Sequence, residues 1–352
     1  MAGSSDSSRP MVVGVASTLS WAVARCLAAA GTPPVVLGWH RFSPMSLLPG
    51  CRRYVAWDGI RWTGGEVELS AVEGIERACR ENGIGVVVPA DYDAGLLLAR
   101  AGALTAARTV PVPSAEDIRS LHDKWRLTGV LQRLRVPFPA SELARDAAGL
   151  LGTALRFPVV TKPLAKWGGI GFQVHATPGD LRLAVDAGTL AAPFPLLVQE
   201  FVPGCDVGIS FLARRGRLVA YSMFEHVRDG ERRFYDDPRL RGHVERLLEE
   251  TRYDGVGHVD TRRDGERGEC QVLEFNPRFW ASLLYALRAG VNYPDLLVRL
   301  DEIAGDPVRT ARPGRVTLEA AERALSLAVR WWERAYVAVH RLGERRAPTV
   351  KA

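Results

Sequence analysis

The sequence lacks the features that would place the protein in a membrane or outside the cell. No run of 18 or more apolar residues occurs among its 352 residues, which excludes an ordinary transmembrane helix. The opening residues, MAGSSDSSRP, are polar and contain no apolar signal core, so residues 1–10 are predicted to be disordered, with no secretion signal. The five cysteines are scattered, odd in number and never spaced C-x-x-C, which indicates neither a disulfide framework nor a zinc site. We therefore expect a reduced, cytoplasmic protein.

Lysine is scarce in this chain. Only four of the 46 basic residues are lysine, and three of them, Lys124, Lys162 and Lys166, lie within one 43-residue stretch. A lysine ammonium reaches a phosphate as a compact point charge, whereas the planar guanidinium of arginine docks differently. The three neighbouring lysines are therefore candidate phosphate-binding residues.

The first hundred residues alternate between short apolar strands and helices. We expect strands at 11–16, 34–39 and 85–90 and helices at 20–30 and 68–82. This rhythm predicts a parallel sheet with helices on its faces. The first turn, GVASTLS, lacks the second and third glycines of a dinucleotide-binding fingerprint, so we expect this part to act as scaffold or substrate cleft.

A boundary is predicted at PVPSAED (111–117), which is rich in proline and places Ser114 as a helix N-cap three residues before Asp117. Beyond it we expect a helix from 114 to about 134, a second helix near 141–154, strands at 157–162, 171–175 and 196–201, and a helix at 178–187. After residue 206 the pattern is mainly strands of alternating polarity, the last at 272–276.

Phosphate chemistry is suggested by FPVVTKP (157–163) and the glycines that follow it. The apolar strand delivers Lys162 at its end, and Gly168, Gly169 and Gly171 form a turn whose N–H groups can close over phosphate oxygens. Glycine-rich turns are also common in ordinary hairpins. Downstream, the strand LVQEFVPG (197–204) ends in Pro-Gly, where the backbone of Glu200 and Val202 could meet an adenine edge, or could simply enter a turn.

A candidate metal site is carried by GVGHVD (255–260) and QVLEFNPRFW (271–280), two apolar segments joined by a polar turn as in a hairpin. Side chains alternate along a strand, so Glu274 and Asn276 share one face. With Asp260 opposite, three oxygen ligands converge, which suits Mg²⁺ bridging ATP phosphates. Arg278 could clamp a phosphate or carboxylate with two bonds. Acidic residues beside hairpins are often only solvated, but carboxylates inside apolar strands are costly to bury unpaired.

Together these segments resemble the ATP-grasp superfamily, in particular its carbamoyl-phosphate-synthase-like branch of carboxylate–amine ligases. The resemblance spans about residues 11–305 and rests on HDKW (122–125), VVTKP (159–163), the glycine loop, VQEFVPG (198–204) and LEFNPRF (273–279), in the family's order. The segment ALRAGVNYPDLLVRL (286–300) is similar to the helix that follows the family's metal strand.

The resemblance implies an α/β (α+β) ATP-grasp fold with an N-terminal parallel-sheet pre-ATP-grasp lobe, a small lid subdomain and a C-terminal antiparallel-sheet lobe. The expected division is 1–10 disordered, 11–113 pre-ATP-grasp domain, 114–204 lid subdomain, 205–312 C-terminal subdomain with the metal site, and 313–352 a basic amphipathic helix and tail.

The resemblance also implies roles for single residues. The ATP phosphates would be bound by Lys124 and Lys162 and covered by a lid loop of Lys166, Gly168, Gly169 and Gly171. Adenine would be held by Glu200, Phe201 and Val202, and the ribose by Asp206. Mg²⁺ or Mn²⁺ would be held by Asp260, Glu274 and Asn276, with Arg278 beside the transferred phosphate. This chain departs from the family at two positions: it has Asp260 where the family often has Glu, and Trp167 where the family usually has a small polar residue.

The activity implied is an ATP-dependent carboxylate–amine ligase that forms an amide through an acyl phosphate, releasing ADP and phosphate. Its substrates would be a small carboxylic acid and an amine, in natural-product or dipeptide biosynthesis. The alternatives are another acceptor, as in carboxylation or carbamoyl chemistry, or a catalytically silent nucleotide-binding protein. No residue stands out as the general base that deprotonates the amine.

The C-terminal stretch 317–343 is predicted to be a basic amphipathic helix. Its arginines (Arg323, Arg330, Arg334 and Arg341) project within about 20° of one direction and its apolar residues lie opposite. Such a helix can pack on its own domain, pair in a homodimer or rest on an anionic membrane, and we expect the first more than the last. The other arginines are dispersed, so we expect no nucleic-acid partner.

Overall fold

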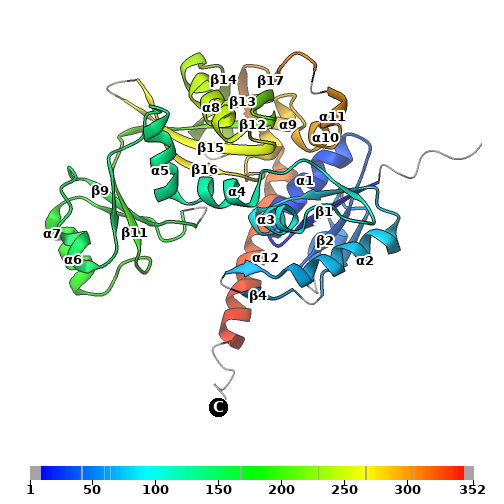
Figure 1. The fold of residues 1–352 in the computed structure, drawn as a ribbon, viewed down its shortest axis with the longest axis horizontal. Helices are drawn as coiled ribbons and strands as arrows, with labels where there is room; N and C mark the ends of the chain where they lie inside the picture. Colours follow the sequence, from blue (N-terminus) through cyan, green and yellow to red (C-terminus); the bar gives the residue numbers. More distant parts are fainter. Residues whose placement is uncertain are drawn as a thin grey trace, which may run out of the picture.

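The computed structural model describes residues 9–40, 43–58, 60–63, 65–166, 169–228, 230–265, 268–303 and 305–344, with side chains in the last helix as far as Ala335. Residues 1–8, the loop residues Trp167 and Gly168, and the tail from residue 345 lie outside the described part. The disorder predicted for residues 1–10 is wrong at Pro10, which is buried and begins the first strand. Three sheets of four or more strands organise the described residues (Figure 1).

The N-terminal sheet is parallel, as predicted, in the order β3-β2-β1-β6-β7. Its strands are β1 (Pro10–Gly14), β2 (Val35–Gly38), β3 (Arg53–Ala56), β6 (Val86–Pro89) and β7 (Arg108–Thr109). Because side chains alternate along β1, Val12 packs with α1 (Ser17–Ala29) on one face, while Met11 and Val13 pack with α2 (Val72–Asn82) and α3 (Tyr92–Ala101) on the other. The short elements η1 (Pro44–Leu47), β4 (Trp62–Thr63), β5 (Glu66–Val67) and η2 (Leu69–Ala71) lie in the connections.

The second sheet is antiparallel, in the order β10-β9-β11-β8, and has a small core of its own. Its elements are β8 (Ser141–Ala144), α6 (Ala147–Leu151), β9 (Val159–Pro163), β10 (Gln173–His175), α7 (Pro178–Asp186) and β11 (Leu196–Glu200). The predicted helix near 141–154 is wrong. Residues 141–144 pair with β11, and α6 begins only after Asp146, whose side chain accepts a hydrogen bond from the N–H of Gly149.

The third sheet has seven strands, and all its pairings are antiparallel except β13 with β17. Its strands are β12 (Gly204–Arg214), β13 (Arg217–Arg228), β14 (Glu231–Tyr235), β15 (Gly255–Asp264), β16 (Cys270–Asn276), β17 (Arg309–Thr310) and β18 (Gly314–Thr317). One face packs against α4 (Ala115–His122), α5 (Lys124–Arg133) and α8 (Pro238–Thr251). The other shares a core with the N-terminal sheet through α9 (Leu283–Arg288), α10 (Tyr293–Val298) and α11 (Leu300–Ile303).

The single helix expected from 114 to 134 is two helices, α4 and α5. Ser114 caps α4 as predicted, accepting a hydrogen bond from the N–H of Asp117. Asp123 then breaks the helix, because its side chain accepts hydrogen bonds from the N–H groups of Trp125 and Arg126 and so starts α5. The two helices, assigned by the predicted division to the lid, pack instead on β16 of the third sheet. The break makes Lys124 the first residue of α5.

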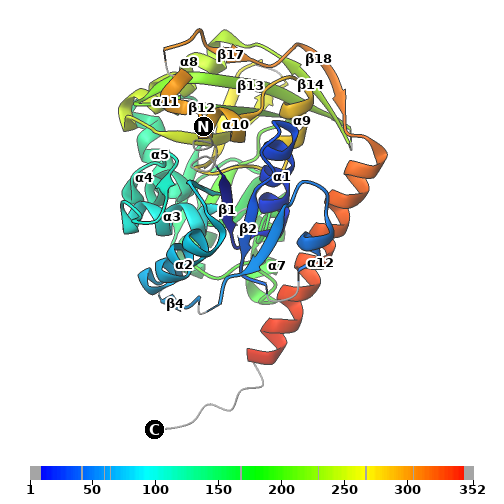
Figure 2. The ribbon, with the colours of Figure 1, turned by 90° about the vertical axis from the view of Figure 1, so that its right-hand side faces the viewer.

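The last helix, α12 (Ala320–Glu344), confirms the predicted helix and packs on its own chain. Leu325 and Val329 join the core shared by the N-terminal and third sheets, and the ring of Trp332 lies 4.9 Å from that of His40. Figure 2 shows α12 beside α1 and continuing past the edge of the N-terminal sheet. Within the described ranges, no helix has both the length and the apolar character needed to span a membrane.

Candidate active site

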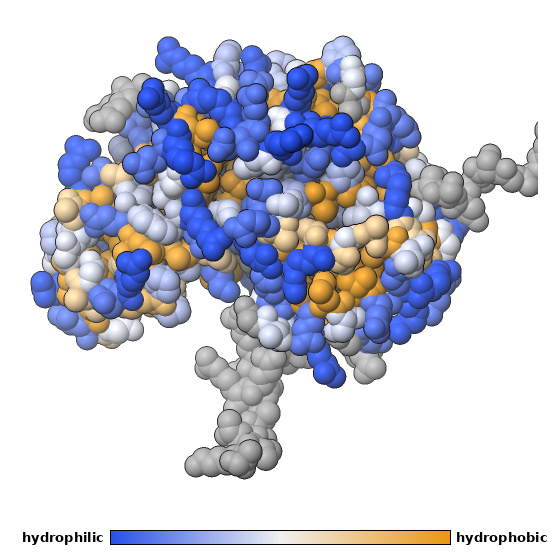
Figure 3. Space-filling model, viewed as in Figure 1, coloured by the Kyte–Doolittle hydropathy of each residue, from blue (hydrophilic) through white to orange (hydrophobic). Residues whose placement is uncertain are grey.

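A cavity of about 1550 Å³ is lined by residues of the second and third sheets, by residues that follow strands of the N-terminal sheet, and by α12. Figure 3 shows one face of the molecule hollowed between the second sheet and the rest of the chain. The cavity brings together ten of the predicted site residues: Lys162, Gly169, Glu200, Phe201, Val202, Asp206, Asp260, Glu274, Asn276 and Arg278. Lys124, Lys166 and Gly171 are not among the residues that line it.

The predicted metal ligands lie on the paired strands β15 and β16. Asp260 is directly opposite Glu274, and Asn276 is opposite His258. The side-chain amide of Asn276 donates to Asp260 Oδ2 over 2.9 Å. His258 Nε2 lies 3.1 Å from Asp260 Oδ1. The hairpin predicted from the sequence is therefore confirmed, and its register places the two carboxylates side by side.

Burial affects the two carboxylates differently. It raises the pKa of Glu274, and neighbouring Asp260 adds to the rise, although Lys124 Nζ lies 3.4 Å from Glu274 Oε2 and opposes it. Burial acts to raise the pKa of Asp260, but His258, which hydrogen-bonds this carboxylate, acts together with Arg278 and His226 to hold that pKa below its usual value. The two carboxylates thus lie side by side and half-buried in the cavity, with Lys124 in ion-pair contact with Glu274.

These residues fit a divalent cation of the hard, oxygen-binding kind. Two carboxylates and one amide offer oxygen donors of the type that Mg²⁺ prefers. The raised pKa of Glu274 indicates an anion whose burial a bound cation would relieve. Across the described residues, no three His, Cys, Asp or Glu side chains form a metal-binding group, so any such site here depends on Asn276. Asn276 Oδ1 accepts a hydrogen bond of 2.8 Å from Arg278 Nη2, which ties the arginine to the same site.

Two lysines lie beside the carboxylates. Lys162, on β9, is 8% exposed and donates to Gln199 Oε1 over 2.9 Å. Burial, reinforced by the charge of Lys124, lowers the pKa of Lys162 to about 8. Lys124 is 4% exposed, and its ammonium donates to the backbone oxygen of Lys166 over 2.5 Å. Lys166 itself is exposed on the loop after β9. A phosphate bound beside the Lys162 ammonium would add negative charge there and so favour its protonated form.

The loop after β9 depends on glycine for its conformation. Gly169 and Gly171 have φ values of 74° and 76°, a region in which a Cβ is strained. Gly171 also lies against its neighbours, because a Cβ there would stand 2.9 Å from Pro163 Cδ, whereas a Cβ at Gly169 would meet nothing within 4 Å.

This difference gives a testable prediction for the loop. We expect Gly169→Ala to lower the free energy of unfolding by about 1 kcal/mol, from backbone strain alone. Gly171→Ala should lower it by ~2–3 kcal/mol, because the added clash is with the ring of Pro163. Urea unfolding of the two variants measures the difference. Equal effects would show that the close approach at Gly171 does not matter.

The predicted adenine segment follows β11. The N–H groups of Glu200 and Phe201 donate to Ala140 and Pro158, and the Glu200 side chain pairs with Arg156. Within the described part of the chain, the N–H of Val202 has no acceptor. In this segment the N–H of Val202 is therefore the backbone donor that is available to a ligand in the cavity.

The carboxylate predicted to bind the ribose already has a protein partner. Asp206 Oδ1 accepts a hydrogen bond of 2.7 Å from Arg262, whose guanidinium lies 5.2 Å from the ring centre of Phe201. A ribose at Asp206 would therefore share this carboxylate with Arg262.

The structure adds two carboxylates that sequence reasoning missed. Asp91 and Asp93 follow β6 and line the cavity. Asp91 is fully used by the backbone, since it accepts hydrogen bonds from the N–H groups of Val15, Ala16 and Ala94. Burial, reinforced by the charge of Asp91, raises the pKa of Asp93 to about 7. Both residues follow the carboxyl end of a buried parallel strand, and ligands bind at that edge of a sheet. This position was the sequence signal that could have identified them as candidate site residues.

The first turn of the N-terminal sheet binds protein carboxylates. Glu333 of α12 accepts hydrogen bonds from the N–H groups of Ser17 and Thr18, each 3.2 Å long, and Asp91 takes the two N–H groups before them. The N–H groups at the start of α1 therefore bind the carboxylates of Asp91 and Glu333, whereas in a dinucleotide-binding site the N–H groups of this turn would bind a pyrophosphate.

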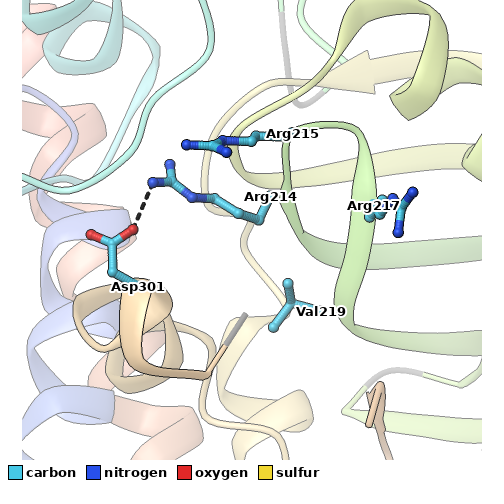
Figure 4. A pocket seen from close by; sticks show the side chains of 5 residues that line it. All are labelled: Arg214, Arg215, Arg217, Val219 and Asp301. Carbon is cyan, nitrogen blue, oxygen red and sulfur yellow. Dashed lines mark hydrogen bonds and ion pairs between the residues drawn. The ribbon is translucent and has the colours of Figure 1, made fainter. Parts of the chain in front are cut away.

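A smaller cavity of about 390 Å³ lies by the β12–β13 turn, where Arg214 and Arg215 point toward Asp301 (Figure 4). Arg214 donates to Asp301 over 2.6 Å and also contacts Asp254. Arg214 is the last residue of β12, whereas Asp260 pairs with Gly208 near the middle of that strand. This cavity is a local ion-pair cluster, and the larger one is the candidate active site.

Comparison with known proteins agrees with this arrangement. Residues 193–323 match the model of a family described as "ATP-grasp in the biosynthetic pathway with Ter operon". The C-terminal section of the carbamoyl phosphate synthase large chain from Methanopyrus kandleri is 24% identical over 183 residues, which cover 46% of this chain and 34% of that protein. The match thus spans about a third of the length of this curated relative.

Two solved structures share the fold over most of the chain. The biotin carboxylase domain of Hydrogenobacter thermophilus 2-oxoglutarate carboxylase, in complex with MgADP, ADP and bicarbonate, has a TM-score of 0.63 at 17% identity, covering 86% of this chain and 71% of that one. An L-amino acid ligase from Bacillus licheniformis has a TM-score of 0.62 at 16% identity, covering 87% and 77%. The chain therefore has an ATP-grasp fold, and part of its sequence is similar to the carbamoyl phosphate synthase large chain, as its motifs predicted.

Proposed function

We propose that this protein is an ATP-dependent carboxylate–amine ligase that forms a peptide-type amide bond through an acyl phosphate and releases ADP and phosphate. The observation that carries the proposal is the meeting, in one cavity, of the oxygen donors Asp260, Glu274 and Asn276 with the buried ammonium of Lys162. Cations and oxygen donors so placed suit phosphoryl transfer, which depends on positioning and charge stabilisation. The likeness to ligases and carboxylases of the ATP-grasp fold supports it.

In this proposal each predicted residue keeps its role. Lys124, Lys162 and Arg278 stabilise the γ-phosphoryl group as it passes from ATP to the carboxylate oxygen and ADP is released. The backbone of Glu200, Phe201 and Val202 holds adenine, Asp206 and Arg262 meet the ribose, and the loop of Lys166, Gly168, Gly169 and Gly171 covers the phosphates. Asp260, Glu274 and Asn276 would hold Mg²⁺, or Mn²⁺ in its place, whose charge would offset that of the phosphates.

Asp93 fills the role for which the sequence offered no candidate. Its carboxylate lines the same cavity, and Lys166 and Arg278 are close enough to act on its pKa. A base with a pKa near 7 is matched to removing a proton from an ammonium at neutral pH. We assign Asp93 as the base that takes the proton of the amine as its nitrogen attacks the acyl phosphate and phosphate departs.

Bicarbonate is a second candidate for the phosphoryl acceptor, favoured by the carboxylase neighbour solved with bicarbonate and MgADP. We also propose a cytoplasmic location and a homodimer, the latter supported by that neighbour, which is described as a domain dimer.

The test is nucleotide analysis of the full chain with ATP, Mg²⁺ and hydroxylamine, across amino, hydroxy and aromatic acids and with bicarbonate as a separate arm. ADP that depends on an acid, with the matching hydroxamate, would support acyl-phosphate chemistry and name the acid. ADP that depends on bicarbonate alone would favour the second candidate. AMP would overturn the mechanism, and MgATP binding without turnover would favour a silent nucleotide-binding protein.

A further inference from the structure

The C-terminal helix presents arginines to the candidate active site. Arg323, Arg330 and Arg334 of α12 line the large cavity, together with Ser326 and Leu327. Spacings of seven and four residues place the three arginines on one side of the helix. The rise of a helix separates Arg330 from Arg334 by about 6 Å and Arg323 from Arg330 by about 10 Å along the axis. The predicted basic face is thus a wall of the cavity that holds the carboxylates.

These arginines are not used by the described part of the protein. Nowhere in that part does a carboxylate lie within ion-pair distance of the guanidinium groups of Arg323, Arg330 or Arg334. The acidic residues of α12 are engaged elsewhere: Glu322 pairs with Arg25 and Arg288, and Glu333 accepts from the start of α1. Many of the chain's other arginines, by contrast, are paired, as Arg119 is with Glu66 over 2.7 Å.

The turn between β13 and β14 supports the same wall. Gly230 lines the cavity, and a Cβ there would stand 2.9 Å from Arg323 Nη1, so glycine leaves room for this guanidinium. Arg232, two residues further on, also lines the cavity and lies 4.9 Å from the ring centre of Tyr285. The paired strands β13 and β14 flank this turn, so their hairpin meets α12 at the cavity.

We propose that a substrate of this protein carries a further oxyanion, a carboxylate or a phosphate, beyond the carboxylate that is phosphorylated, and that Arg330 and Arg334 bind it. The inference rests on the proposed function, since it takes the cavity as the substrate site. Each guanidinium presents a planar fork of N–H donors that binds carboxylate or phosphate with two bonds, and two of them one helical turn apart line the same cavity. Arg323 and Arg232 extend the basic wall for the rest of an extended substrate.

The experiment measures thermal stabilisation of the full chain, with MgADP present, by inorganic phosphate, succinate and acetate. Wild type should be stabilised by phosphate or succinate at concentrations where acetate has no effect, and which of the two acts distinguishes a phosphate from a carboxylate. The double variant Arg330→Gln/Arg334→Gln should bind that anion about tenfold more weakly per arginine lost, or ~100-fold in all. Arg330→Lys/Arg334→Lys should recover part of the affinity.

Arg182→Gln, a change of the same kind on the exposed side of α7, is the control and should bind the anion as wild type does. Stabilisation by MgADP alone, equal in all variants, reports the nucleotide site separately, so its absence would count against the proposed function and not against this inference. Equal anion binding by wild type and the double variant, or no preference over acetate, would overturn the inference.

Discussion

Replacement of Glu274 by glutamine is expected to reduce ADP formation by ~10³-fold, because it removes the charged oxygen donor at the centre of the candidate metal site. Glutamine keeps the volume of the side chain and one oxygen, but cannot balance a divalent cation. Burial already raises the pKa of Glu274, so the folded protein tolerates an uncharged group there. The variant should therefore fold as wild type does and fail in chemistry.

Two measurements check this expectation. Turnover is followed with the acid that gives a hydroxamate, and ADP affinity is measured with and without Mg²⁺, which needs no substrate. Glu274→Gln should lose the gain in ADP affinity that Mg²⁺ gives wild type. Glu250→Gln, on α8 and facing Arg133 over 3.7 Å at the surface, is the matched control and should change neither quantity. An unchanged Mg²⁺ dependence in Glu274→Gln would remove Glu274 from the metal site.

The residues that sequence reasoning found are those whose geometry is local. Asp260, Glu274 and Asn276 lie on one hairpin, so the alternation of side chains and a short turn suffice to bring them together. Lys162 likewise ends a strand next to a glycine turn. The helix expected at 141–154 failed for the opposite reason: Ser141 to Ala144 form a strand only because β11, over fifty residues away, pairs with them.

The contributions of other sheets to the site could not be predicted from local pattern. Asp93 reaches the cavity because the N-terminal sheet packs on the third through a shared core, an arrangement that no local spacing encodes. The arginines of α12 were correctly placed on one face of a helix, but which surface they meet depends on where Leu325 and Val329 pack. Sequence periodicity gives the face of a helix, and tertiary packing decides what that face meets.

Asp93→Asn is expected to separate the two halves of the proposed reaction. The variant should form ADP and hydroxamate nearly as wild type does, because hydroxylamine is largely unprotonated at neutral pH and needs no base. Amide formation with an amine substrate, whose ammonium must lose a proton, should fall by ~10²–10⁴-fold. The ratio of hydroxamate to amide, measured with the same acid, reports this split. A variant that lost both products equally would have lost acid activation, and Asp93 would not be the base.

The pH dependence of Asp93→Asn gives an independent reading of the same carboxylate. In wild type, amide formation should rise as the pH passes about 7, the pKa to which burial and Asp91 raise Asp93, and the variant should lack this rise.

The stability of the wild-type protein should change with pH in the opposite direction. The folded protein holds this proton more tightly than the unfolded chain, so wild type loses stability from Asp93 as the pH rises from about 4 toward 7, by at most ~1.4 kcal/mol per pH unit. Asp93→Asn removes that loss. Urea unfolding should therefore show that the free energy of unfolding of the variant, relative to that of wild type, is higher at pH 8 than at pH 4. If the two proteins instead kept a constant difference across this range, Asp93 would titrate as an ordinary surface carboxylate, too acidic at neutral pH to serve as the base.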